Sequence, residues 1–275
     1  MTQSVATVSA ATVPAAKPPA HPITYLSAPA AVSMADRWFE IASIDHFWVR
    51  RRFEVLQHLG DDFIPAVNHI AEIGCGHGLL QLQLENEYGK EVTGFDLNEV
   101  ALKQNVSRIS KVCCYDIFQQ LPTLRQSFDV IFLFDVLEHI SDERAFLNAV
   151  LFHLAPHGKL IINVPAGQWA FSKYDQAAGH VRRYSVETLR EAALASNLQL
   201  KNWSYWGLPL IPTLAVRKLW LLGQRDQSKI ISTGFDSRSS ALNQMLLMLS
   251  RCELLPQQLM GTSLMAVFEN SAGAS

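Results

Sequence analysis

The feature that most constrains the fold is the stretch 70–80, which reads Ile-Ala-Glu-Ile-Gly-Cys-Gly-His-Gly-Leu-Leu. An apolar, β-prone run meets three alternating glycines, Gly74, Gly76 and Gly78, and a helical pattern follows. Glycine is required where the backbone turns sharply and where a ligand approaches the main chain closely. The helix after the turn leaves N–H groups free to attract negative charge. The stretch therefore predicts a strand, a tight turn and a helix start, the arrangement at which open α/β sheets bind nucleotides.

Acidic residues end the next two predicted strands. The second strand ends at Asp96, and the third is followed by Asp116. An acid at the first position can bind ribose hydroxyls, and one at the second can face an adenine amine. The dinucleotide pattern G-x-G-x-x-G would need glycine at position 79, which is Leu79. A nicotinamide-dependent dehydrogenase is therefore disfavoured.

The glycine turn together with these two acids resembles motif I and the two following motifs of class I S-adenosylmethionine-dependent methyltransferases. The alternative is a Rossmann-like turn that binds another ligand or none. The resemblance implies S-adenosyl-L-methionine as methyl donor and S-adenosyl-L-homocysteine as product. The cofactor-binding residues that it implies are Glu72, Gly74, Cys75, Gly76, Gly78, Asp96, Leu97, Asp116, Ile117, Phe134 and Asp135.

The same resemblance implies the fold. We expect an α/β, Rossmann-like sheet of seven strands in the order 3-2-1-4-5-7-6, with the last strand antiparallel and helices on both faces. Strands alternate with helices along the core, which predicts right-handed crossovers. The expected strands cover residues 69–73, 91–96, 112–115, 128–133, 159–164, 198–205 and 263–269. The expected helices cover residues 34–60, 79–88, 98–109, 142–154, 186–195, 210–222 and 241–255.

Composition limits the partners and the compartment. Apolar residues make up 49% of the chain and the formal net charge is -2, so a sizeable core is expected and attraction to nucleic acid is not. The four cysteines form no C-x-x-C pair, and no ligand set for a metal ion is evident. No apolar run reaches the roughly 18–20 residues of a membrane span. We expect a cytoplasmic protein without a bound metal.

Five segments are expected along the chain. Residues 1–32 are rich in Ala and Pro and predict a disordered tail. Residues 33–60 predict a helical lid, in which the run D-H-F-W-V-R-R-R at 45–52 could place an Arg near the methionyl carboxylate or an anionic acceptor. The alternative is an amphipathic helix with a solvated basic face. The remaining segments are the methyltransferase core at 61–206, a helical insertion at 207–261, and a final strand with its tail at 262–275.

Two further stretches carry the expected chemistry. The run F-D-V-I-F-L-F-D-V-L-E-H-I at 128–140 resembles the fourth strand of ubiquinone-biosynthesis-type and related small-molecule methyltransferases. The pattern V-P-A…D-x-x-x-G-H-x-R-R-Y at 164–184 resembles a bacterial subfamily of the class I enzymes. The candidate catalytic residues are His180, His139, Asp175 and Tyr184, with His180 or His139 as the base. The alternatives are that His139 only holds its loop and that the two arginines before Tyr184 pair with surface acids.

The function expected from the sequence is methyl transfer to a small-molecule or lipid-like acceptor, with oxygen as the favoured atom. The alternatives are transfer to nitrogen or carbon, and a non-catalytic scaffold that binds S-adenosylmethionine or S-adenosylhomocysteine. The helical insertion could roof the acceptor pocket, form a homodimer interface or pack on the sheet edge. Peripheral contact with a membrane is the less favoured role, since few basic residues lie near these helices.

Overall fold

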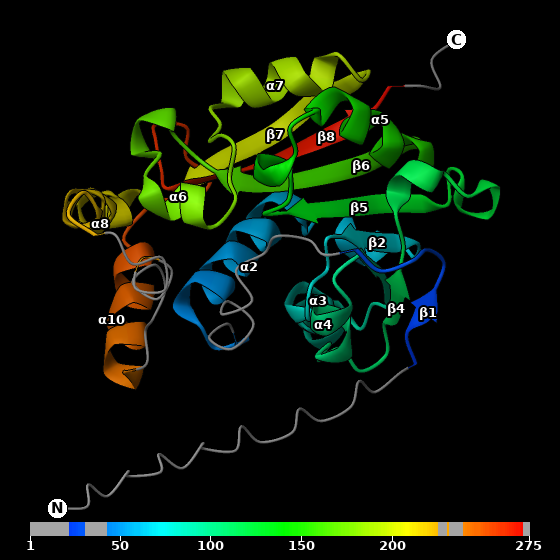
Figure 1. Cartoon of the computed structure of the whole chain (residues 1–275), viewed down its shortest axis with the longest axis horizontal. Helices are drawn as coiled ribbons and strands as arrows, with labels where there is room; N and C mark the ends of the chain where they lie inside the picture. The colour runs from blue at the N-terminus through cyan, green and yellow to red at the C-terminus, as the bar shows by residue number, and fades with distance from the viewer. Residues whose placement is uncertain (1–21, 31–42, 225–229, 231–238, 272–275) are drawn as a thin grey trace, which may run out of the picture.

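The computed structural model describes residues 22–30, 43–224, 230 and 239–271 of the chain. One mixed sheet in the order β1-β4-β3-β2-β5-β6-β8-β7 forms the centre, and helices cover both of its faces (Figure 1). The strands are β1 Thr24–Tyr25, β2 Ile70–Ile73, β3 Val92–Asp96, β4 Lys111–Cys114, β5 Phe128–Phe134, β6 Leu154–Pro165, β7 Leu198–Trp206 and β8 Ser263–Asn270. The α-helices are α2 Phe47–Gly60, α3 Leu79–Tyr88, α4 Glu99–Lys103, α5 Glu143–His153, α6 Lys173–Ala177, α7 Val186–Leu194, α8 Ile211–Leu221 and α10 Ser240–Ser250.

The predicted sheet is confirmed for seven of the eight strands. From β4 to β7 the order corresponds to 3-2-1-4-5-7-6, and β8 is antiparallel to both β6 and β7. All residues of β5 except Asp129 are buried, as is typical of a central strand that is covered on both faces. Apolar clusters lie on the two sides of the sheet, one under α5 and α7 and the other under α2 and α3.

The eighth strand was not predicted. β1 pairs in parallel with the outer edge of β4, with Thr24 opposite Cys113 and Tyr25 opposite Cys114. It lies within the segment that the sequence analysis assigned to a disordered tail, so for residues 22–30 that assignment is corrected. The physical reason is that β-prone Thr24 and Tyr25 stand between prolines, and a two-residue strand is too short to show any periodicity. The rest of the predicted tail lies outside the described residues.

Helix boundaries follow the expected capping residues in most places. Helix α3 begins and ends as predicted, and Gly89 ends it in the left-handed conformation. Asn98 caps α4, but this helix stops at Lys103 instead of near residue 109. It stops because the following residues bond elsewhere: the Val106 N–H donates to the His77 carbonyl in the glycine turn. Helix α5 begins at Glu143 and is capped by Asp142, whose side chain accepts the Ala145 N–H.

The predicted lid segment and the insertion contact each other through hydrogen bonds. Within the predicted lid, residues 47–60 form α2, and residues 33–42 lie outside the described residues. The two predicted helices of the insertion are confirmed as α8 and α10, at one end of the molecule (Figure 1). Asn243 of α10 donates to the Asp45 carbonyl and accepts from the Phe47 N–H at the start of α2. Within the described residues, no helix has the length and hydropathy that crossing a membrane requires.

Candidate active site

The glycine turn between β2 and α3 is formed as the sequence predicts. Gly74, Gly76 and Gly78 have φ angles of 76°, 52° and 80°, a region that favours glycine. A Cβ atom on Gly74 would lie 2.3 Å from Val136 Cγ2, and one on Gly78 would lie 2.5 Å from Asn105 Nδ2. Side chains are therefore excluded here both by backbone conformation and by space.

Asp96, the last residue of β3, is hydrogen-bonded to this turn. The Gly76 N–H donates to Asp96 Oδ2 at 2.8 Å, and the Asn98 N–H donates to Oδ1 at 2.8 Å. Burial raises the pKa of Asp96 above its ordinary value, although these backbone donors oppose the shift. Each carboxylate oxygen keeps a second lone pair, so Asp96 can hold the turn and still accept from a ligand hydroxyl.

Glu72 lies on β2 under the turn and is buried. Burial raises the pKa of Glu72 to about 8, against the opposing charge of Arg52. Within the described residues, its Oε2 atom is buried and has no hydrogen-bond partner. Leaving a buried carboxyl oxygen unpaired is costly, and such atoms are uncommon outside functional sites. The position therefore fits a cationic or hydrogen-donating group of a ligand.

Arg52 of α2 meets the end of β5. Its Nη1 lies 2.6 Å from Asp135 Oδ2, and the guanidinium lies 4.9 Å from the ring centre of Trp48 and 5.0 Å from that of Phe134. Asp135 has a φ of 57° and also accepts from Asn163 Nδ2 at 2.7 Å. Positive φ in a residue other than glycine stores strain and is concentrated at functional sites. Arg52 is buried and ion-paired, so the alternative of a solvated basic face is wrong for it.

Three further predicted cofactor residues lie at the same edge of the sheet. Leu97 follows β3 and Asp116 follows β4, and the ends of these two strands pair at Asp96 and Cys114. Asp116 accepts the Phe118 N–H at 3.0 Å and starts a 3-10 helix, whose first residue, Ile117, is buried in the core. Leu97 and Asp116 thus lie at the same edge of the sheet as the glycine turn. Cys75 is buried within the turn itself.

The candidate base His180 is held by Asp175. Nδ1 of His180 lies 3.0 Å from Asp175 Oδ1, and Asp175 is fully buried. Burial alone would raise the pKa of Asp175, but the hydrogen bond from His180 and the charge of Arg183 lower it to about 2. An ionised carboxylate can only accept, so Nδ1 carries the proton of the neutral ring and Nε2 carries the lone pair.

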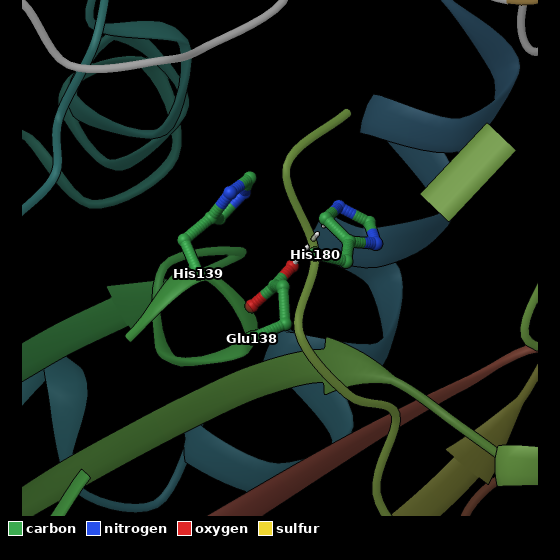
Figure 2. A group of neighbouring side chains, drawn as sticks. All are labelled: Glu138, His139 and His180. Carbon is green, nitrogen blue, oxygen red and sulfur yellow. Dashed lines mark ion pairs between the residues drawn. The ribbon is translucent and has the colours of Figure 1, made fainter. Parts of the chain in front are cut away.

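Glu138, which the sequence analysis did not select, lies across from His180. Figure 2 shows its carboxyl group pointing toward His180, and Oε1 lies 4.0 Å from His180 Nε2. Burial raises the pKa of Glu138 well above its ordinary value, and within the described residues its Oε2 atom has no hydrogen-bond partner. Glu138 stands within the run 128–140 that the sequence analysis quoted, but its pairing could not be predicted because His180 comes from a distant segment.

His139 completes this group. Its ring centre lies 4.8 Å from that of His180, and the two rings are nearly perpendicular at 86°. Burial, together with the nearby His180, lowers the pKa of His139 to about 4. Ligand-type atoms of Glu138, His139 and His180 lie within 4.8 Å of one another, so they could hold a cation as well as exchange a proton. The sequence analysis found no metal-ligand set, because the fold alone brings these residues together.

Tyr184 is placed differently from the other catalytic candidates. Its ring is buried in the core, and its hydroxyl donates to Glu143 Oε2 at 2.8 Å and lies 3.3 Å from the Leu137 carbonyl. These contacts support the short 3-10 helix Leu137–His139 from behind. Arg182 also binds Glu143, which confirms the alternative of acid pairing for this arginine. Arg183 instead donates to Asp175 at 2.7 Å.

Comparison with known proteins gives the family. Residues 47–205 match the model of a methyltransferase domain. The ubiquinone biosynthesis O-methyltransferase of Idiomarina loihiensis is 33% identical over 102 residues, which cover 34% of this chain and 41% of that protein. A protein of Mycolicibacterium smegmatis described as a probable S-adenosylmethionine-dependent methyltransferase is 28% identical over 122 residues, covering 44% of this chain and 46% of that protein. The matches thus span less than half the length of these curated relatives.

Solved structures agree on the fold. The crystal structure of a SAM-dependent methyltransferase from Archaeoglobus fulgidus superimposes with a TM-score of 0.51 at 18% identity, covering 81% of this chain and 96% of that chain. At this identity the likeness concerns the fold alone. Because the family model matches more than half of the chain and the sheet has the expected order, the protein belongs to the class I S-adenosylmethionine-dependent methyltransferases.

Proposed function

We propose that the protein transfers the methyl group of S-adenosyl-L-methionine to a hydroxyl oxygen of a small-molecule acceptor. The observation that carries this proposal is the buried Glu72 carboxyl, which has an unpaired oxygen within the described residues and lies on β2 just before the glycine turn. An amino-acid ammonium would supply the missing donor.

Each part of the donor has residues that fit it. Glu72 would accept from the ammonium group, and Arg52 is the nearby cation for the carboxylate. Asp96 would accept from the ribose hydroxyls, and Asp116 with Ile117 would meet the adenine. When bound, the donor supplies an electrophilic methyl group on a sulfonium, and its departure as a neutral thioether needs no acid. The protein then contributes mainly orientation of donor and acceptor, the largest single gain in such a reaction.

The acceptor would lie over Glu138, His139 and His180. A hydroxyl must lose its proton as it is methylated, and His180 Nε2 can take that proton because Asp175 holds Nδ1. The same carboxylate would then stabilise the imidazolium. The ubiquinone-biosynthesis relative is named as an O-methyltransferase, which supports oxygen over nitrogen or carbon.

The insertion borders this acceptor side. Arg217 of α8 lies 4.6 Å from the ring centre of Tyr174 in α6, the helix that also carries Asp175. The outer face of α8 exposes Val216, Leu219 and Trp220, at 67%, 68% and 47%. These side chains face outward, so a lipid-like acceptor roofed by α8 stays a prediction. A homodimer interface and a membrane contact at these helices stay predictions.

The proposal is tested in two steps with the whole chain. Isothermal titration should show binding of S-adenosyl-L-homocysteine and none of NAD. Asp96→Ala should weaken that binding more than tenfold without unfolding the protein, whereas Asp62→Ala, at an exposed acid, should not. Incubation with radiolabelled S-adenosylmethionine and fractionated small-molecule extract should then label one compound at an ether oxygen. Tight binding without any labelled compound would favour the scaffold function and overturn the enzymatic one.

A further inference from the structure

The segment at the edge of β4 makes little contribution to the core. Tyr25 and Leu26 are 50% and 36% exposed, and only two residues of this segment pair as a strand. Its anchor is Ile23, which packs against the small apolar cluster that includes Cys75 of the glycine turn. Figure 1 shows β1 outside β4, at the end of the sheet opposite α8 and α10.

Among the described residues, its polar contacts go to β4, to the ends of β3 and β4 and to the start of α4. The N–H groups of Leu26 and Ser27 donate to the Cys114 carbonyl at 2.9 and 3.1 Å. The Asp116 N–H donates to Ser27 Oγ at 2.9 Å. The Ala30 N–H donates to the Leu97 carbonyl at 3.1 Å. Residues 26–30 therefore span the two loops that follow β3 and β4.

These two loops carry the residues expected to meet adenosine. Asp116 Oδ1 accepts the Phe118 N–H, and the Asp116 N–H donates to Ser27. Because both the backbone and one carboxyl oxygen of Asp116 are held, the direction of the other carboxyl oxygen of Asp116 is set as well. The Leu97 backbone is held in the same way by Ala30. The contacts of residues 26–30 thus act on the adenosine side of the site and not on the core.

We propose that residues 26–30 form a wall of the adenosine site, in which Ser27 and Ala30 are positioning residues for Asp116 and Leu97. This inference rests on the proposed function, because that function places adenosine at these loops. A segment with so few buried contacts opens locally at low free-energy cost. A ligand that contacts Leu97 and Asp116 together stabilises the closed wall, and the closed wall in turn increases the affinity for that ligand.

The test is titration of the full chain with S-adenosyl-L-homocysteine. Ser27→Ala removes the acceptor for the Asp116 N–H, and Ala30→Pro removes the donor to Leu97. Each should weaken binding by about two- to tenfold, the effect of one neutral hydrogen bond, and the double variant by about four- to 100-fold, since independent effects multiply. Tyr25→Phe, which removes only the exposed hydrogen bond to Glu99, is the matched control and should bind as wild type.

Two further readouts separate a wall from a merely structural edge. Ligand should slow amide hydrogen exchange at residues 26–30 in the wild type and less so in Ser27→Ala. In an Asp116→Asn background, Ser27→Ala should cost less affinity than it does alone, because both changes act on one contact. Folded Ser27→Ala and Ala30→Pro variants with wild-type affinity would overturn the wall alone. A wild-type protein that does not bind S-adenosyl-L-homocysteine would overturn the proposed function and the wall with it.

Discussion

Asp175 fixes the orientation of His180: its carboxylate accepts from Nδ1 at 3.0 Å and turns Nε2 toward Glu138. Both residues lie between β6 and α7, while Glu138 follows β5, so two separate segments build one side of the proposed acceptor site. Because the ionised Asp175 can only accept, this pairing leaves Nε2 as the nitrogen that can take up a proton.

His180→Gln should lower the rate of methyl incorporation about 100-fold or more, because general base catalysis contributes about 10²–10⁴-fold. Its affinity for S-adenosyl-L-homocysteine should stay within about threefold of wild type. The assay follows label from S-adenosylmethionine into the small-molecule extract. His58→Gln, at an exposed histidine of α2, is the control. Undiminished incorporation by folded His180→Gln would remove this residue as the base.

Removal of metal ions should leave the activity unchanged. The proposed proton transfer to His180 needs no cation, even though Glu138 and His139 place further ligand atoms nearby. Dialysis against EDTA followed by the labelling assay measures this. If activity were lost and returned with Mg²⁺, Mn²⁺ or Zn²⁺, the three residues would be assigned to a cation and the role of His180 as base would be abandoned.

Binding of the cofactor product should release protons near pH 7. Glu72 has a pKa of about 8 in the free protein, so its uncharged form predominates there, and an ammonium partner favours the charged form. Titrations in buffers of different ionisation enthalpy should therefore give different apparent binding enthalpies. Glu72→Gln should reduce this buffer dependence, and Glu87→Gln, at an exposed acid, should not. An equal dependence in Glu72→Gln would contradict the contact.

Protonation of His139 affects the stability of the folded protein. The pKa of His139 is about 4 in the folded protein against about 6.5 when unfolded, so the unfolded chain takes up the proton first as pH falls. The contribution of neutral His139 is fully present above pH 6.5 and is lost between pH 6.5 and 4. Urea unfolding across this range should show decreasing stability, with a smaller decrease in His139→Asn. An identical slope in both proteins would show that His139 is not the group responsible.

Alanine substitutions at two glycines distinguish the cost of backbone strain from the cost of steric crowding. Gly89 has a φ of 62° and nothing within 4 Å of an added Cβ, so Gly89→Ala should cost about 1–2 kcal/mol of unfolding free energy. Gly74→Ala adds the clash with Val136 to the same strain and should cost more, with loss of S-adenosyl-L-homocysteine binding. Urea unfolding and calorimetric titration measure the two effects. Equal costs with retained binding would contradict the close packing of the turn.

Local sequence signals predicted the parts of the fold that depend on local chemistry. The bounds of α3 follow from Gly78 and Gly89, and β5 follows from the apolar run at 130–134. The strand order came from the family resemblance. The early end of α4 was missed because it depends on Val106 bonding to the glycine turn, a contact between distant residues.

The site shows the same division. The positions of the glycine turn, Asp96 and Asp116 were predictable because each stands at or just after the carboxyl end of a strand, at the same edge of the sheet. Glu138 was missed, and Arg52 could not be distinguished from its two arginine neighbours, because their roles depend on His180 and Asp135, which are far from them in sequence. The edge strand was hidden by its proline-rich surroundings. A strand of two residues is too short for its side-chain periodicity to be detected in the sequence.

The measurement that tests the account most directly is a crystal structure of the protein grown with saturating S-adenosyl-L-homocysteine. The account predicts adenosine between Asp96 and Asp116, and the homocysteine amine at the Glu72 carboxyl oxygen that now lacks a donor within the described residues. An empty crevice at saturation, or the compound bound away from these three acids, would contradict it.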